Sequence, residues 1–131
     1  MPLATHHLAL GAHDVERVAA FYREVFELPE VARHLHPDGR LRSIWLGLSS
    51  GVLMVEQTDA PGRRIEGIEP GLFMVAFGVQ AGGHDEVLLR ASRLLGRDDL
   101  VEQATTHTRY LRDPEGNRVA VSSYPLPGPH A

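Results

Sequence analysis

Residues His6 to Pro29 read HHLALGAHDVERVAAFYREVFELP, and this stretch decides the fold. It begins inside a short strand-like segment, residues 5–10, and Gly11 is expected to end that strand. Asp14 is a good helix N-cap, and apolar residues then recur at helical spacing as far as Phe26. The sequence therefore predicts a strand followed by a helix from about Asp14 to Phe26.

Three further strands are expected after this helix, and the whole pattern then occurs a second time. The first set of strands covers residues 31–35, 41–48 and 52–57, with turn residues between them. The second half has a strand, a helix that opens with His84 and Asp85 and is expected to stop at Gly96, and three more strands. The strands are expected at residues 72–79, 100–104, 106–112 and 117–123. The chain is therefore predicted to contain two βαβββ units.

The two units are expected to form one domain, because the chain has the length of a single domain. The turn-rich stretch in the middle, with its glycines and prolines, separates the units as a linker. The predicted organisation is a single domain over residues 1–131, with module one at 5–58, the linker at 59–70, module two at 71–124 and a Pro-rich tail at 125–131.

Composition excludes several kinds of chemistry. The chain has no cysteine, and all 13 of its basic residues are arginine, so thiol nucleophiles, disulfides and Schiff-base lysines are absent. A net charge of −4 argues against nucleic acid as a partner. No apolar run approaches the length of a membrane helix, and the first residues lack the pattern of a signal peptide, so we expect no membrane partner and a cytoplasmic location.

Two motifs together resemble those of the vicinal oxygen chelate superfamily, which includes glyoxalase I, bleomycin-resistance proteins and extradiol dioxygenases. The first is the quoted stretch, and the second is YLRDPEGNRVAV at Tyr110 to Val121. The resemblance implies an α+β fold in which two βαβββ modules form a half-open mixed β-barrel with one helix per module on the outside. It also implies a homodimer and a cavity that receives a small molecule.

The resemblance also implies where a metal would be held, and two of the four positions are apolar here. The family's ligand positions match His7, Glu56, Met74 and Ala120, and an alignment shifted by two residues would put Met54 in place of Glu56. A catalytic zinc site keeps three protein ligands, whereas His7 and Glu56 supply only two. The metal site is therefore expected to be degenerate, and a divalent metal ion is a cofactor only if a bound ligand completes the site.

Strand alternation predicts which side chains line the cavity. If Glu56 faces inward, its companions on that face are Ser43, Trp45 and Met54, and in module two the corresponding set is Met74, Thr108, Tyr110 and Ser122. We expect Trp45, Ser43, Met54, Met74, Thr108 and Ser122 to contact the ligand. This mixture of apolar and hydroxyl groups suits a small, partly aromatic organic molecule.

Three functions remain open at this point. The first is a metal-free protein that binds a small organic molecule in an apolar cavity. The second is a divalent-metal-dependent lyase, isomerase or dioxygenase that uses His7 and Glu56. The third is a metal-free enzyme in which Glu56 is the general base and Tyr110 donates a hydrogen bond to a developing oxyanion.

Overall fold

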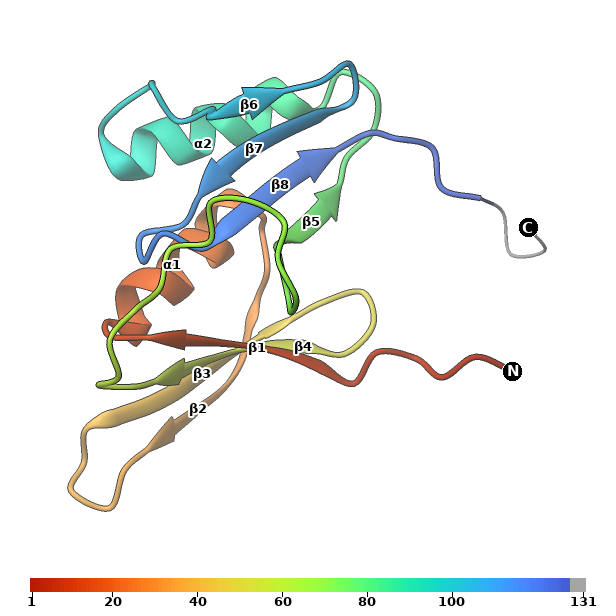
Figure 1. Cartoon of the computed structure of the whole chain (residues 1–131). Coiled ribbons are helices and arrows are strands. Elements are labelled where there is room, and N and C mark those ends of the chain that lie inside the picture. The colour runs from red at the N-terminus through yellow and green to blue at the C-terminus, as the bar shows by residue number, and fades with distance from the viewer. Residues whose placement is uncertain (128–131) are drawn as a thin grey trace. The chain divides into compact units, whose positions relative to one another are not determined.

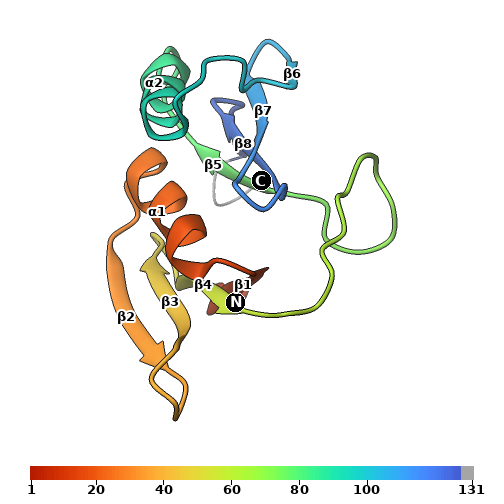
Figure 2. The same ribbon diagram turned by 90° about the vertical axis from the view of Figure 1, so that its left-hand side faces the viewer.

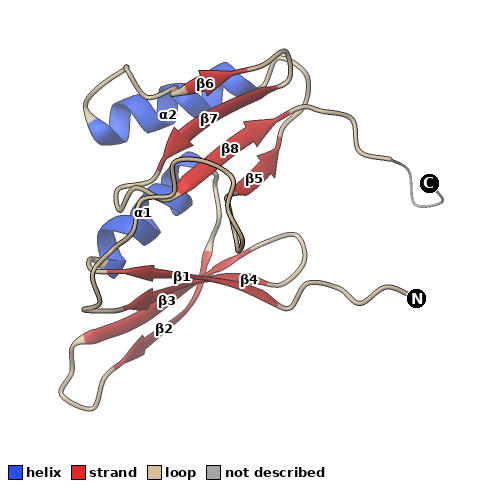
Figure 3. Cartoon of the chain, in the orientation of Figure 1, coloured by secondary structure: helices blue, strands red, loops and turns tan. Residues whose placement is uncertain are grey.

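The computed structural model describes residues 1–127 and contains eight strands and two helices in that range. The chain divides between Arg63 and Arg64 into two compact units, each with one βαβββ module, as the sequence predicts (Figure 1). A loop without helix or strand, residues 58–74, joins the last strand of module one to the first strand of module two (Figure 3). The boundaries of a single folding domain stay a prediction, and the last four residues of the expected tail lie outside the described residues.

Module one is a four-stranded mixed sheet with one helix. Its elements, in chain order, are β1 (His7–Ala12), α1 (Val15–Val25), β2 (Glu30–Leu35), β3 (Leu41–Gly47) and β4 (Val52–Gln57). The strand order in the sheet is β1-β4-β3-β2. The pairing of β1 with β4 is parallel, and the other two pairings are antiparallel. This sheet is open, since β1 and β2 are its edge strands.

Helix α1 begins and ends where the sequence predicts and lies along one face of the β1–β4 sheet (Figure 2). The Asp14 side chain accepts a hydrogen bond of 3.1 Å from the Arg17 amide, which is the expected N-cap. The fully buried residues of the helix and of the strand face beneath it are Val18, Ala19, Phe21, Tyr22, Val25, Ile44, Leu46, Leu53 and Val55. Gly11 does not end β1, because the ladder with β4 continues to the pair Ala12 and Gln57.

An arginine links the edge strand β2 to α1. The Arg33 guanidinium donates to both carboxylate oxygens of Glu16 on the helix at 2.8 and 2.9 Å, and to those of Glu30 at 3.2 and 2.9 Å. These hydrogen bonds hold the pKa of Glu16 and the pKa of Glu30 below their usual value. The pairs are solvent-accessible, so each is screened.

The ion pairs of Arg33 with Glu16 and Glu30 predict that the protein loses stability at acid pH. The ordinary glutamate pKa is 4.5, and both folded-state pKa values are lower, so the pairs stabilise the fold above that pH and are lost as the pH falls through the lowered values. We expect Arg33→Gln to flatten the fall in unfolding free energy between about pH 6 and about pH 3, measured by urea denaturation. Arg97→Gln, which removes only an exposed pair with Asp99, is the control, and an unchanged slope in Arg33→Gln would contradict the assignment.

Module two repeats this plan with shorter strands. Its elements are β5 (Val75–Gly78), α2 (His84–Leu95), β6 (Gln103–Ala104), β7 (Thr108–Arg112) and β8 (Arg118–Ser122). The sheet order is β5-β8-β7-β6, with β5 and β8 parallel. The α+β class with two such modules is therefore confirmed. Neither helix among the described residues has the length and apolar character that crossing a bilayer requires.

Two boundaries in module two differ from the sequence-based expectation. β5 begins at Val75 and not at Leu72, because its ladder with β8 begins at the pair Val75 and Val119. β6 is only two residues long, and its hydrogen-bonded partners in β7 are Tyr110 and Arg109. The end of α2 is as expected, since Gly96 takes a left-handed conformation with φ of 69°.

The turn between β7 and β8 is organised by one buried carboxylate. Asp113 is 4% exposed and accepts hydrogen bonds from the Glu115 amide at 2.9 Å and the Asn117 amide at 3.0 Å. Its second oxygen accepts from the Asn117 side chain at 2.9 Å. Gly116 has φ of 87°, which is the left-handed conformation that closes the turn. The Asp-Pro-Glu-Gly-Asn motif therefore fixes the start of β8.

Removing this carboxylate is expected to destabilise the protein. Asp113→Ala leaves buried backbone donors without a partner, so the unfolding free energy should fall by about 1–3 kcal/mol. Guanidinium denaturation monitored by circular dichroism gives the midpoint. Asp99→Ala, at a site where the aspartate side chain is 82% exposed, is the matched control and should change the free energy by less than about 0.5 kcal/mol. Equal midpoints for the two variants would contradict this role of Asp113.

Candidate functional site

The face of the β1–β4 sheet that α1 does not cover carries side chains from all four strands. We call it the open face of module one. The strand register arranges these residues in rows that run across the sheet. The first row is Gly11, Glu56, Ser43 and His34; the second is Ala9, Met54, Trp45 and Ala32; the third is His7, Val52 and Gly47.

The first two rows contain polar atoms that are buried without a hydrogen-bond partner. Ser43 is 1% exposed, yet its hydroxyl has no partner among the described residues. The same holds for the Nε2 atom of His34 and the indole Nε1 of Trp45. The rings of His34 and Trp45 meet edge to face with centroids 4.7 Å apart. Such atoms cost free energy when they remain unpaired, so their presence on one face indicates a place where water or a ligand binds.

The arrangement combines a polar row with an apolar one. Glu56 lies directly across from Ser43 in the ladder and is half-buried, and its carboxylate makes no hydrogen bond or ion pair within residues 1–127. Met54 lies directly across from Trp45 in the next row. A planar molecule placed on the second row would meet the indole and the thioether, and its polar groups could reach the first row.

His34 is not among the site residues that the sequence predicts. It lies inside β2, and a register irregularity between His34 and Leu35 places it opposite Ser43. The alternation of Ala32 and His34 was the available signal for their common face. The register irregularity could not be predicted from the sequence, because a β-bulge leaves no distinctive pattern in these residue types.

His7 lies at the other end of the open face from Glu56. Its register partner is Val52, whereas Glu56 is opposite Gly11, so the two positions are four residues apart along the ladder, or roughly 13 Å. Met54, the alternative to Glu56, is one row from His7. The His7 ring is exposed, and its Nδ1 is 2.9 Å from the Nδ1 of His6.

The residues of module one do not fit a divalent metal ion. Metal–ligand bonds are about 2 Å long, so His7 and Glu56 at this spacing cannot share one ion. Throughout the described part of the chain, no group of three or more His, Cys, Asp or Glu residues is placed to hold a metal. Ala120 offers no ligand atom, and the soft thioether of Met74 does not suit a hard ion.

Module two brings together most of its own predicted residues. Tyr110 lies opposite Ala120, and Thr108 lies opposite Ser122, all on the face of the sheet that α2 does not cover. The hydroxyls of Thr108 and Ser122 are 2.7 Å apart. Met74 is just outside β5 and is 38% exposed. Glu56 and Tyr110 belong to different modules, so neither module alone holds the predicted pair of base and oxyanion donor.

Comparison with solved structures supports the fold. The chain is similar to FosX, a fosfomycin resistance protein of Listeria monocytogenes, with 19% identity, 96% and 95% of the two chains covered, and a TM-score of 0.73. FosX from Mesorhizobium loti gives 15% identity, coverage of 96% and 95%, and a TM-score of 0.72. TioX from Micromonospora sp. ML1 gives 19% identity, coverage of 92% and 98%, and a TM-score of 0.62. At these identities the likeness concerns the fold alone.

Sequence comparison places the chain in a family. A comparison with curated proteins found no match. The family model for the Glyoxalase/Bleomycin resistance protein/Dioxygenase superfamily matches residues 4–121, which is most of the chain and includes both motifs that carried the resemblance. The protein therefore belongs to the glyoxalase/bleomycin resistance protein/dioxygenase superfamily.

Proposed function

We propose that the protein binds a small, partly aromatic organic molecule on the open face of module one and does so without a metal ion. The observation that carries this proposal is the set of buried, unpartnered polar atoms of His34, Ser43 and Trp45 on that face. The indole and hydroxyl groups are hydrogen-bond donors, and the imidazole donates or accepts according to its tautomer. A ligand with acceptor oxygens would satisfy them.

The apolar row explains why the ligand should be planar. Trp45 is half-buried and lies between Met54 and Ala32 in the ladder. These three side chains form an apolar surface beside the polar row. Stacking on an aromatic face stabilises a planar ligand beyond the burial of area alone. An apolar surface with a few convergent polar groups is the usual composition of a small-molecule site.

Trp45 is the only tryptophan in the chain, so its fluorescence reports on this face alone. Naphthoquinone is a suitable probe, because it is planar, carries two acceptor oxygens and finds no cysteine to react with. We expect it to quench Trp45 saturably, and Ser43→Ala to weaken its binding about two- to tenfold through the loss of one hydrogen bond. His34→Ala should act in the same direction.

Ser50→Ala is the matched control for this experiment, since Ser50 lies in the exposed turn before β4. It should bind the probe as the unmodified protein does. Quenching that does not saturate, or equal affinities for Ser43→Ala and Ser50→Ala, would reject the open face as the binding site.

A metal-dependent activity is the alternative, since a Listeria FosX structure contains Mn(II). In the present chain, His7 and Glu56 are too far apart to share an ion, so we expect Mn²⁺ to bind no more tightly than about 1 mM in calorimetric titration of the whole protein. Glu56→Gln should leave that weak signal unchanged. Stoichiometric binding in the micromolar range that disappears in Glu56→Gln would favour the metal-dependent alternative and overturn the metal-free proposal.

A metal-free enzyme is a second candidate, and the unpaired carboxylate of Glu56 favours it. Glu56 lies one strand away from Ser43, so a ligand held by the Ser43 hydroxyl would place its own protons near a potential general base. In that case Glu56→Gln would abolish turnover while the quenching of Trp45 by a ligand persists. The homodimer, the cytoplasmic location and the contribution of Tyr110 as a donor stay predictions from the sequence.

A further inference from the structure

Module two presents an arginine whose charge is not compensated. Arg118 is the first residue of β8, and its register partner on β7 is Arg112. Residues directly opposite each other in an antiparallel ladder point to the same face, so two guanidinium groups begin side by side. Like charges in this position destabilise a sheet unless other groups offset them.

The guanidinium of Arg112 is paired with carboxylates and hydrogen-bonded to backbone carbonyls. Its Nε donates to Glu102 at 2.9 Å, and its remaining nitrogens reach the carbonyls of Ile65 and Gly116 at 2.7 and 3.0 Å and the carboxylate of Glu66 at 3.6 Å. Glu102 also accepts from Arg64 at 2.5 Å. These two carboxylates are therefore already engaged with two arginines.

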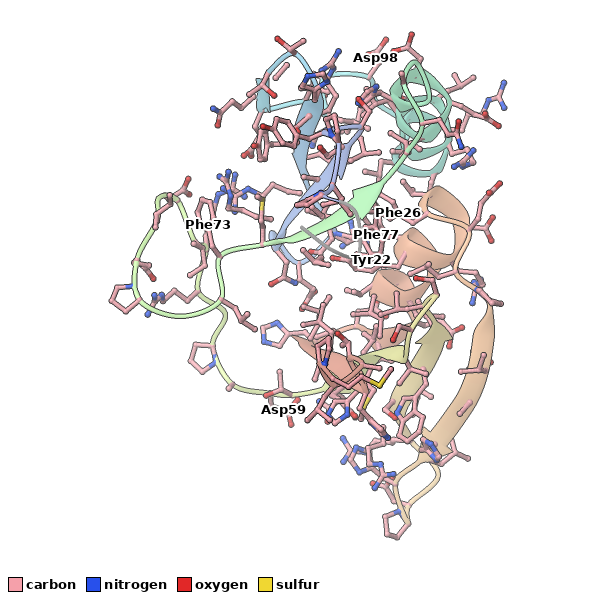
Figure 4. The ribbon with its side chains drawn as sticks, turned by 90° about the vertical axis from the view of Figure 1, so that its right-hand side faces the viewer. Tyr22, Phe26, Asp59, Phe73, Phe77 and Asp98 are labelled. Atoms are coloured by element: carbon pink, nitrogen blue, oxygen red, sulfur yellow. The ribbon has the colours of Figure 1, made fainter. Side chains whose placement is uncertain are left out.

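Arg118 has no such partner among the described residues. No ion pair joins it to a carboxylate, and its Nε is buried without a hydrogen bond. The guanidinium carbon lies 4.3 Å from the centroid of the Phe73 ring and 5.6 Å from that of Tyr110. Figure 4 labels Phe73 on the stretch that leads into β5. The two rings attract the cation through their faces, but they satisfy none of its N–H donors.

The start of β5 at Val75 is consistent with this contact. Met74 is the residue that would extend the ladder opposite Arg118, and β5 begins one residue after it. The segment before β5 instead brings Phe73 onto the guanidinium. The chain thus positions the arginine by aromatic contact and leaves its hydrogen-bonding edge for another group.

We propose that Arg118 is the recognition site for the oxyanion of a small organic molecule, a carboxylate or a phosphate, on the face of the module-two sheet that α2 does not cover. A planar guanidinium binds either group with two parallel hydrogen bonds. The flanking rings of Phe73 and Tyr110 orient the fork and exclude water from one side of it. The residues that form this site all belong to module two, and the proposal does not depend on the function proposed for Trp45.

Calorimetric titration of the whole protein with two probes, benzoate and inorganic phosphate, tests the proposal. We expect at least one probe to bind saturably and Arg118→Gln to weaken it at least about tenfold. Tighter binding of benzoate would identify a carboxylate whose apolar part uses the two rings, and tighter binding of phosphate would identify a phosphate. Arg97→Gln, at an arginine paired with Asp99 in an exposed turn, should bind both probes as before.

Arg118→Lys keeps the experiment informative if the glutamine variant does not fold. It retains the positive charge but loses the planar fork, so its affinity should fall between those of the unmodified protein and Arg118→Gln. Lack of saturable binding by either probe, or equal affinity in the unmodified protein and a folded Arg118 variant, would overturn the proposal. Neither result bears on the quenching of Trp45, which reports on module one.

Discussion

The structure depends on the fact that a strand alternates its side chains between two faces while each module has a single helix. In module one, α1 covers one face of the sheet with Val18, Tyr22 and Val25, and the strand residues beneath them are Ile44, Leu46, Leu53 and Val55. The alternate residues of the same strands must then face the other way. The packing that holds the module together therefore also selects which residues are presented on its open face.

On that second face, buried polar side chains reduce stability unless a hydrogen-bond partner is present. Ser43 is nearly as inaccessible as its apolar neighbours in β3, but its hydroxyl makes no hydrogen bond within the described structure. Arg118 in module two likewise has a buried polar atom, Nε, without a hydrogen-bond partner. Its guanidinium lies against aromatic rings, which provide no acceptors for its N–H groups. By contrast, Asp113 satisfies both of its carboxylate oxygens within one turn. The proposed binding sites therefore use polar groups without a partner, whereas the fully hydrogen-bonded carboxylate of Asp113 stabilises a turn.

The register of β1 and β4 also sets the spacing of His7 and Glu56, two of the positions that match the family's metal ligands. His7 and Glu56 both occupy positions on the open face of module one, and the sequence alone could treat them as a pair. The parallel ladder sets His7 opposite Val52 and Glu56 opposite Gly11. The antiparallel ladders instead place Glu56, Ser43 and His34 in one polar row, in which the histidine comes from β2 and not from β1. Direct hydrogen bonds to this row and stacking on Trp45 are the contacts that the proposed metal-free binding would use.

Short-range patterns of hydrophobicity, capping and turn residues predict the two βαβββ modules, the N-cap at Asp14 and the stop at Gly96, and two sequence motifs carry the resemblance to the family. The sequence also assigned Ser43, Trp45, Met54 and Glu56 to one set, since alternation within neighbouring strands is a local property. The sequence does not predict that His34 lies opposite Ser43, that His7 is two rows from Glu56, or that Phe73 contacts Arg118. Each of these depends on a ladder register, a bulge or a contact made by a loop, which is set by packing between segments distant in the chain.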